Sequence, residues 1–337
     1  MRIVFLGRTQ MLMQTIKLFE QSGHTIAGIG TCRAASEYLV NEDDFKNKAN
    51  QLGVPFFCDS RINSQNIQNI LRSMNADIAI SVNWLTVIQE DTINLFSYGI
   101  LNGHAGDLPR YRGNACPNWA IIGGEEKIGL SVHFMEAGSL DSGDIVVKEY
   151  VDITPQTTIG EIYEKMETMF PQMFLQAVGK IDRMGKEAGS PQSKKREDIL
   201  RCYPRVPGDS CIDWSMSCTE IDRLIRASGY PFQGAYTFLN GEEKVYIQAA
   251  GISEYEFPSA VICGQVVLRD CEKDCVGIAA KDGVVIIEKL CDSCHRPHKV
   301  TEKIRSMRDR MGMCVPDKIY ELMKEVEELK KMIDRDR

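Results

Sequence analysis

Residues 1–30 read MRIVFLGRTQMLMQTIKLFEQSGHTIAGIG, and this stretch decides the fold of the first half of the chain. Residues 2–6 and 25–30 are short apolar runs that lead into glycine, which predicts two buried strands. Residues 11–22 between them predict an amphipathic helix. Strand, helix and strand in this order favour a βαβ unit with parallel strands. The opening run lacks the long apolar core of a secretory signal, so we expect it to be the first strand.

The same alternation continues to about residue 102. Helices are expected at residues 45–52 and 67–74, and strands at residues 55–57, 76–82 and 98–102. This order predicts an α/β fold with a Rossmann-like, mostly parallel sheet, whose active site lies beyond the carboxyl ends of the strands. A complete GxGxxG fingerprint and a GxxxxGK[ST] phosphate loop are both missing, which disfavours hydride transfer and ATP chemistry.

The pattern changes near residues 185–205, where glycine and proline surround the basic string Lys194-Lys195-Arg196 and predict an exposed linker. Beyond it, β-like runs separated by Asn240-Gly241 and Asp282-Gly283 turns predict a smaller, β-barrel-like domain. We therefore expect four segments: a catalytic domain at residues 1–190, a linker at 191–205, a β-rich domain at 206–312 and a C-terminal helix at 313–337.

Composition narrows the class of protein. The chain has 337 residues, 43% hydrophobic and 26% charged, which excludes a mainly disordered protein. Its apolar runs fall short of the roughly 18–20 residues that a membrane span needs, so we expect no membrane attachment and a cytoplasmic location. Forty Lys and Arg against 47 Asp and Glu give a net charge of −7, which does not favour a polyanionic partner. Twelve cysteines without an export signal predict free thiols.

One cysteine cluster, CDSCHRPH at residues 291–298, has two alternative interpretations. Its CxxCH string matches covalent haem attachment, and Cys291, Cys294, His295 and His298 together offer zinc ligands. Haem attachment requires export, and the spacing is cramped for zinc. We therefore expect free thiols at the end of a strand, and no metal.

The densest group of polar and reactive residues lies between residues 99 and 144. Asn102 and His104 are two apart at the end of an apolar strand, so their side chains leave on the same face. An amide donor beside an imidazole can polarise a carbonyl and move a proton. Taken alone, such a histidine is more often structural. Asp141, on a later loop flanked by glycines, could orient or acidify His104, whereas Asp144 is more simply a turn residue.

Three strings in this region resemble the formyltransferase family that uses 10-formyltetrahydrofolate. They are Asn102-Gly-His104, Leu108-Pro-Arg-Tyr-Arg112-Gly113 and Leu140-Asp-Ser-Gly143-Asp144. Later strings resemble the C-terminal domain of the same family: Ile212-Asp213-Trp214-Ser215, Leu224-Ile225-Arg226-Ala227 and Gly234-Ala235-Tyr236. The resemblance covers about residues 1–310 and implies an enzyme that transfers one-carbon groups.

The resemblance implies a role for each matching residue. Asn102 would bind the formyl oxygen, His104 would assist proton transfer from the attacking amine, and Asp141 would hold His104 and help to protonate the folate nitrogen. This transfer needs no metal. Residues of two loops would hold the pterin ring of the folate: Val82, Asn83, Trp84, Leu85, Ala137, Gly138 and Asp141. A further loop would lie near the acceptor substrate: Arg110, Tyr111, Arg112 and Gly113.

The sequence identifies the acceptor amine less directly than it identifies the candidate catalytic residues. Family members that act on initiator methionyl-tRNA carry a basic insertion after the second strand, whereas residues 31–44 are acidic here, a poor surface for a phosphate backbone. The string at residues 104–113 is closer to the branch that N-formylates nucleotide-linked amino sugars, which we expect as substrate. Methionyl-tRNA stays open, because residues 194–196 and 296–310 are basic. A non-catalytic folate- or nucleotide-binding protein is a third possibility, disfavoured by the proton-transfer group at His104.

Residues 317–337 predict a strongly charged helix with an a/d seam of alternating three- and four-residue spacing: Ile319, Leu322, Val326, Leu329 and Ile333. β-Branched residues at a and Leu at d favour a parallel pair. We therefore expect a homodimer to which this helix contributes. Packing of the helix on its own chain is the alternative, because about two heptads make a short seam.

Overall fold

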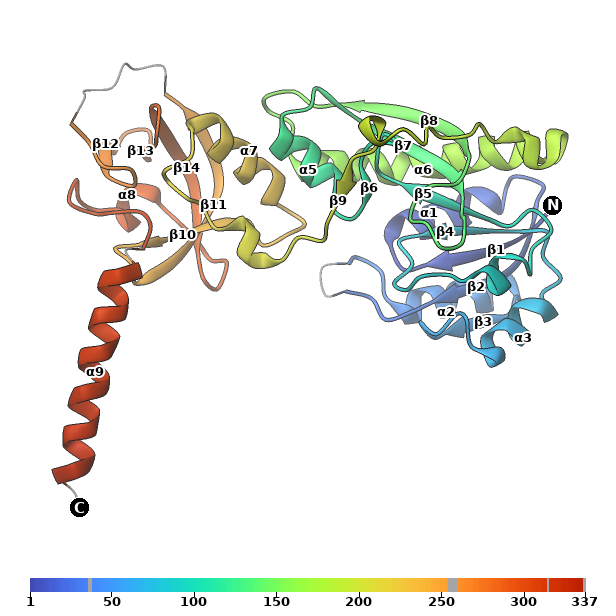
Figure 1. Cartoon of the computed structure of the whole chain (residues 1–337), viewed down its shortest axis with the longest axis horizontal. Helices are drawn as coiled ribbons and strands as arrows, with labels where there is room; N and C mark the ends of the chain where they lie inside the picture. The colour runs from blue at the N-terminus through green and yellow to red at the C-terminus, as the bar shows by residue number, and fades with distance from the viewer. Residues whose placement is uncertain (36–37, 254–259, 314, 336–337) are drawn as a thin grey trace. The chain divides into compact units, whose positions relative to one another are not determined.

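The computed structural model describes residues 1–35, 38–253, 260–313 and 315–335 (Figure 1). Residues 36–37, part of the acidic segment predicted at 31–44, lie outside the described residues. The chain divides into two compact units: residues 1–120 with 124–205, and residues 121–123 with 206–337. Within the described ranges, no helix is long and apolar enough to cross a membrane.

The sheet of the first unit has seven strands in the order β3-β2-β1-β4-β5-β7-β8. The first five of these are parallel, and β7 and β8 are antiparallel to their neighbours, so the predicted mostly parallel α/β sheet is confirmed. Strand order reverses between β1 and β4, the kind of position where open sheets bind ligands. The strands are β1 (Arg2–Gly7), β2 (Thr25–Thr31), β3 (Phe56–Cys58), β4 (Ile78–Val82), β5 (Ile100–His104), β7 (Lys127–Phe134) and β8 (Ile145–Asp152).

Helices cover both faces of this sheet because its central strands are apolar on both sides. On β1, Val4 and Leu6 join a buried cluster with α3, whereas the ring of Phe5 meets Phe19 of α1 at 5.4 Å on the other face. The helices of this unit are α1 (Gln10–Phe19), α2 (Glu42–Leu52), α3 (Gln65–Ser73), α4 (Glu90–Ile93), α5 (Cys116–Gly123, whose last residues belong to the second unit) and α6 (Ile159–Met184).

One strand of a two-stranded sheet lies within residues 191–205, the predicted linker. β6 (Arg112–Gly113) pairs in parallel with β9 (Arg201–Cys202), and the indole N–H of Trp119 donates to the Tyr203 carbonyl at 2.9 Å. Three short 3-10 helices lie before, within and after residues 191–205: Gly185–Ala188, Arg196–Asp198 and Pro207–Ser210. Residues up to 205 are therefore built into the first unit, beside the loop that follows β5.

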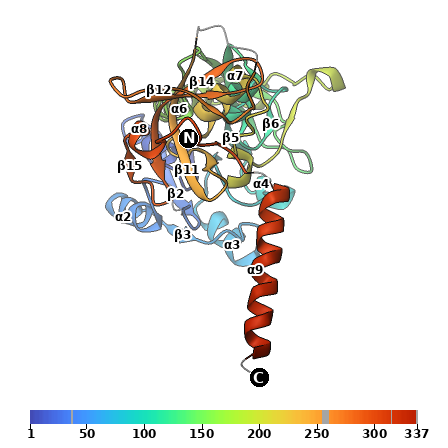
Figure 2. The same cartoon turned by 90° about the vertical axis from the view of Figure 1, so that its left-hand side faces the viewer.

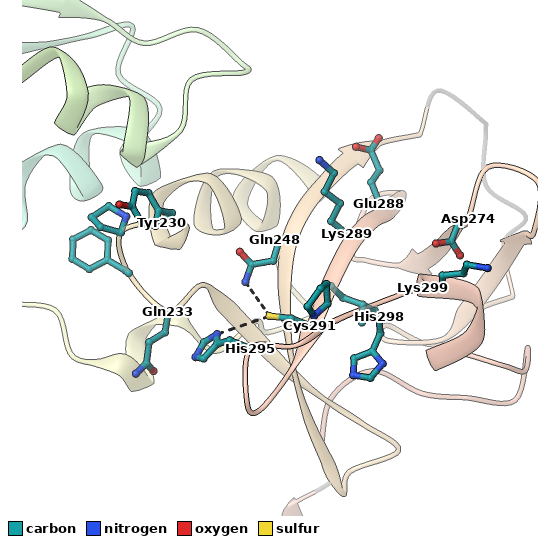
Figure 3. A pocket seen from close by; sticks show the side chains of 14 residues that line it. Tyr230, Gln233, Gln248, Asp274, Glu288, Lys289, Cys291, His295, His298 and Lys299 are labelled. Atoms are coloured by element: carbon teal, nitrogen blue, oxygen red, sulfur yellow. Dashed lines mark hydrogen bonds between the residues drawn. The ribbon is translucent and has the colours of Figure 1, made fainter. Parts of the chain in front are cut away.

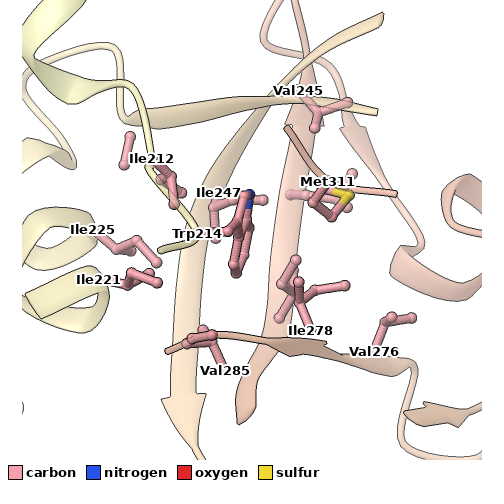
Figure 4. Close-up of a cluster of buried hydrophobic side chains, with 14 of the residues drawn as sticks. Ile212, Trp214, Ile221, Ile225, Val245, Ile247, Val276, Ile278, Val285 and Met311 are labelled. Atoms are coloured by element: carbon pink, nitrogen blue, oxygen red, sulfur yellow. The ribbon is translucent and has the colours of Figure 1, made fainter. Parts of the chain in front are cut away.

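The second unit is an antiparallel sheet in the order β10-β11-β14-β13-β12, with β15 paired to β14. Residues 310–311 bridge its two edges, through Leu239–Met311 and Gln265–Arg310, which makes the sheet barrel-like as predicted. Trp214 lies in the core (Figure 4). Its indole N–H donates to the hydroxyl of buried Thr237 at 2.9 Å. The elements are α7 (Cys218–Ser228), β10 (Ala235–Leu239), β11 (Glu243–Ile252), β12 (Val266–Asp270), β13 (Cys275–Ala279), β14 (Val284–Asp292), β15 (Pro297–His298), α8 (Val300–Lys303) and α9 (Val315–Arg335).

Candidate active site

Asn102 and His104 lie at the carboxyl end of β5, on the strand face opposite Gly103. A Cβ on Gly103 would lie 2.9 Å from the Phe174 ring of α6, so this glycine lets the helix approach the strand closely. Asn102 is paired with His133 of β7, and the Asn102 amide nitrogen lies 3.2 Å from His133 Nε2. The strand register therefore adds a second histidine to the predicted pair.

Asp141 lies in the loop between β7 and β8 and faces both imidazoles. Its Oδ2 is 3.6 Å from His104 Nδ1, and its Oδ1 is 3.6 Å from His133 Nε2. The Gly113 N–H donates to Oδ2 at 2.9 Å. The side chains of His104 and Asp141 are only 9% exposed. The structure thus brings together the three predicted catalytic residues and adds His133, which the sequence analysis did not assign to the site.

Hydrogen bonds to backbone carbonyls assign the histidine tautomers. His104 Nε2 donates to the Tyr111 carbonyl at 2.6 Å, which leaves Nδ1 toward Asp141. His133 Nδ1 donates to the Phe134 carbonyl at 2.7 Å, which leaves Nε2 to accept from the Asn102 amide. Asn102 keeps its second amide hydrogen for another acceptor.

Burial and charge act differently on the two titrating groups that face each other. Burial raises the pKa of Asp141, but the imidazoles of His133 and His104 in their protonated forms and the Gly113 N–H outweigh it and lower the pKa to about 2. Burial also lowers the pKa of His104, and the Asp141 carboxylate offsets only part of this shift. Near neutral pH the pair is therefore a carboxylate and a neutral imidazole, which can accept a proton.

Gln192 holds the loop that carries Asp141. Its amide Nε2 donates to the carbonyls of Asp141 at 2.9 Å and Gly143 at 2.7 Å, and its Oε1 accepts from Arg112 at 2.7 Å. Gln192 is buried, and Asp141 has a left-handed φ of 51° that this loop must maintain. Gln192 is therefore a candidate positioning residue. No motif in the sequence marked it, because its partners lie about 50 to 80 residues away.

The loop after His104 approaches the imidazole so closely that Gly106 has no room for a side chain. A Cβ there would lie 2.2 Å from the Tyr111 carbonyl oxygen and 2.4 Å from His104 Nε2. Cys116 Sγ also contacts this region, 3.0 Å from the Tyr111 oxygen. Its hydrogen bond with Cys202, together with burial, raises the pKa of the Cys116 thiol, so it is not a nucleophile at neutral pH.

The four predicted substrate-loop residues have partners of their own in the first unit. Arg110 and the Tyr111 hydroxyl both donate to Glu125, at 2.8 Å and 2.7 Å. Arg112 reaches Gln192, and Gly113 reaches Asp141. Arg112 Nε is a buried nitrogen with no hydrogen-bond partner within the part of the chain that the structure describes. The loop is thus fixed against the candidate catalytic groups.

The two loops predicted to hold a pterin meet at one hydrophobic cluster. Trp84 and Ala137 both pack against the buried side chains around α3. Asn83 has a φ of 54° and donates to the Tyr38 hydroxyl at 2.7 Å, whereas Leu85 is 53% exposed. Val82 is buried at the end of β4, and Gly138 has a φ of 78° with open space around it.

The cysteine cluster at residues 291–298 lies in the second unit, beside a pocket of about 850 Å³ (Figure 3). Cys291 accepts from Gln248 at 3.2 Å and lies 3.9 Å from His295 Nδ1, whereas His298 pairs with Asp292 at 3.1 Å. Cys294 is exposed. Among the described residues, no three His, Cys, Asp or Glu side chains converge as ligands for a metal ion.

Two family models match the chain. One, described as Formyl transferase, matches residues 1–178, and one, described as Formyl transferase, C-terminal domain, matches residues 206–308. The chain belongs to the formyl transferase family. The enzyme class that the sequence motifs implied is thereby confirmed. Residues 309–337, which include all of α9, lie outside both matched segments.

Relatives of this formyltransferase extend over both units. A methionyl-tRNA formyltransferase from Alkaliphilus oremlandii is 28% identical over 295 residues, 86% of this chain and 91% of the relative. An N-formyltransferase structure from Helicobacter canadensis, with folinic acid and dTDP-3-aminofucose, has a TM-score of 0.62 at 14% identity and covers 88% of this chain and 99% of that one. HypX from Aquifex aeolicus with tetrahydrofolic acid has a TM-score of 0.60 at 17% identity, over 91% of this chain and 47% of HypX. The identities of 14% and 17% to these two solved structures show a shared fold.

Proposed function

We propose that this formyltransferase moves the formyl group of 10-formyltetrahydrofolate to the amine of a nucleotide-linked amino sugar. The observation that carries the chemistry is the series Asn102, His133, Asp141 and His104, each within 3.6 Å of the next. A pure binding protein needs no neutral imidazole paired with an ionised carboxylate. This arrangement supports proton transfer and therefore catalysis.

The reaction balances with these side chains alone. The amine nitrogen attacks the formyl carbon, and the formyl oxygen gains negative charge that the second amide hydrogen of Asn102 stabilises. The neutral His104 ring accepts the proton that the amine loses, and ionised Asp141 stabilises the imidazolium. The bond from the carbon to the folate nitrogen then breaks, and that nitrogen receives the proton. One formamide and one tetrahydrofolate result.

The charge of the described surface supports a small acceptor rather than RNA. The first turn of α2 is acidic, with Glu42, Asp43 and Asp44. In the basic segment 296–310, several cations are already paired with acids: Arg296 with Asp292, Lys299 with Glu302, and Lys303 with Glu243. A phosphate backbone binds through cations that release counterions, and paired cations contribute less to such binding.

The test is an assay of the full chain with 10-formyltetrahydrofolate and a panel of dTDP-, UDP- and GDP-linked amino sugars, read by mass spectrometry. We expect one class of sugar to gain a formyl group. His104→Ala and Asn102→Ala should each lose turnover by roughly 100-fold or more. His298→Ala, a histidine variant in the second unit, is the matched control and should keep full turnover. Near-normal transfer by His104→Ala would refute the site.

Methionyl-tRNA is the second candidate acceptor, because the curated relatives at 28–29% identity are methionyl-tRNA formyltransferases and match both units. The same assay with methionyl-tRNA separates the candidates. We expect no formylation and no salt-resistant gel retention of tRNA. Formylation of methionyl-tRNA, with none of the sugar panel modified, would establish this alternative instead.

A further inference from the structure

Helix α9 presents a stripe of apolar side chains that are about half exposed. The five seam residues are between 48% and 57% exposed: Ile319, Leu322, Val326, Leu329 and Ile333. Figure 2 draws α9 as a single straight helix. Isolated helices are marginal in water and gain stability mainly by packing an apolar face. A helix with half-exposed apolar side chains therefore gains stability when a partner covers its stripe.

We propose that α9 pairs with α9 of a second copy of this chain, as a parallel two-stranded coiled coil. β-Branched residues occupy the a positions 319, 326 and 333, and leucine occupies the d positions 322 and 329. This distribution is the one that favours parallel dimers over larger bundles. A second copy is also the partner that supplies a stripe of identical spacing.

The charges beside the stripe specify the same orientation. Glu325 is at a g position, and Lys330 is at the e position of the following heptad. In a parallel, in-register pair, these two positions lie opposite each other, so Glu325 meets Lys330 of the partner subunit, twice by symmetry. An antiparallel pair places g beside g and loses both ion pairs. Charge therefore selects parallel pairing.

The seam is short, so its contribution to association is limited. Its remaining e and g positions include Met323 and Met332, which are exposed and widen the apolar stripe. Lys318, another g residue, already pairs with Glu321 in its own helix at 3.1 Å. Because α9 lies outside the matched family segments, this pairing is an addition to the formyltransferase units and is independent of the proposed substrate.

Sedimentation equilibrium tests the pairing on the full chain at about 1 to 100 µM. We expect a dimer whose dissociation constant rises by at least about tenfold when the chain is truncated after Pro316. Formyl transfer per chain should not change, because its residues lie in the first unit, and this serves as the control for folding. A monomeric full-length chain, or a dimer unaffected by the truncation, would overturn the proposal.

Charge reversal tests the orientation. Glu325→Lys and Lys330→Glu should each weaken association by about threefold to tenfold, and the double variant should restore it. Glu328→Lys and Lys331→Glu make the same charge changes at the outward c and f positions and are the matched controls, which should not alter the dissociation constant. Failure of the double variant to recover would rule out the parallel pairing, because only that arrangement joins positions 325 and 330.

Discussion

The Asp141 carboxylate faces the imidazoles of both His104 and His133. Its effect on His104 has a measurable consequence for the pH dependence of the proposed catalysis. Burial lowers the pKa of His104 below its ordinary 6.5, and Asp141 opposes that shift. The imidazole must be neutral to accept the amine proton, so turnover falls as pH drops through this pKa. Removing the carboxylate removes the opposing effect and lowers the pKa of His104 further.

We therefore predict that Asp141→Asn lowers turnover and moves the acid limb of the kcat/KM profile to lower pH. The profile should be recorded for wild type and variant with one substrate, because the substrate's own amine then titrates identically in both. Folate binding, followed by calorimetry, should be largely kept. An acid limb that stays in place or moves to higher pH would show that Asp141 does not act on His104.

Gln192 provides a second residue-level prediction, for a side chain that touches the loop of Asp141 rather than the reacting atoms. Gln192→Leu keeps most of the volume but removes the amide that binds the Asp141 and Gly143 carbonyls. Misplaced catalytic groups lose rate steeply, so kcat should fall by roughly tenfold or more, and the acid limb should shift as in Asp141→Asn. Gln156→Leu, at an exposed glutamine, is the control. A lower thermal stability with an unchanged kcat and pH profile would assign Gln192 a purely structural role.

The candidate-site residues that stand in local motifs could be predicted from the sequence, whereas those that only the fold brings close could not. Asn102, His104 and Asp141 were identified through short strings. His133 faces Asn102 because β5 and β7 are antiparallel neighbours in a particular register. The short motif around Asn102 contains no information on that register. One signal was available, since after Lys127 the strand consists of apolar and small residues apart from His133, and it is buried along most of its length.

At the level of elements, the contact between β5 and α6 fixes the strand end that carries the proposed catalytic residues Asn102 and His104. Gly103→Ala would place a Cβ 2.9 Å from the Phe174 ring, and we expect it to lower the free energy of unfolding of the first unit by about 1–3 kcal/mol. Gly179→Ala, on α6 itself with no atom within 4 Å of the added Cβ, should instead raise it by about 0.4–1 kcal/mol. Urea denaturation of both variants gives the comparison, and equal midpoints would contradict the close packing.

The elements that the sequence predicts best are those marked by a pattern within a few consecutive residues. The strands β1, β2 and β4 are short apolar runs, and they appear within one or two residues of the expected positions. Helix α6 was not predicted, although Thr158 and Glu161 form a capping box and apolar residues follow at helical spacing. Pro171 inside the helix interrupts that pattern. The strands β6 and β9 have two residues each and are strands only because they pair with each other. A local sequence pattern does not predict such a pair.

For the whole molecule, the proposed chemistry and the sulfur- and histidine-rich segment belong to different units. The proton path runs through His104 and Asp141 in the first unit, whereas residues 291–298 lie in the second. There Cys291 is held by Gln248, and His298 by Asp292. These pairings use the side chains that the zinc interpretation would require as ligands.

We therefore predict that exhaustive treatment with a chelator leaves formyl transfer unchanged. The assay compares chelated and untreated full-length protein at one saturating concentration of each substrate, with metal content measured in parallel. Cys291→Ser and His298→Ala should behave like wild type in both conditions, because neither side chain takes part in the proposed transfer. Activity that disappears on chelation and returns with added zinc, but does not return in those two variants, would assign a metal to the second unit. It would also make the transfer depend on both units, and the proton path through His104 and Asp141 would then be insufficient for catalysis.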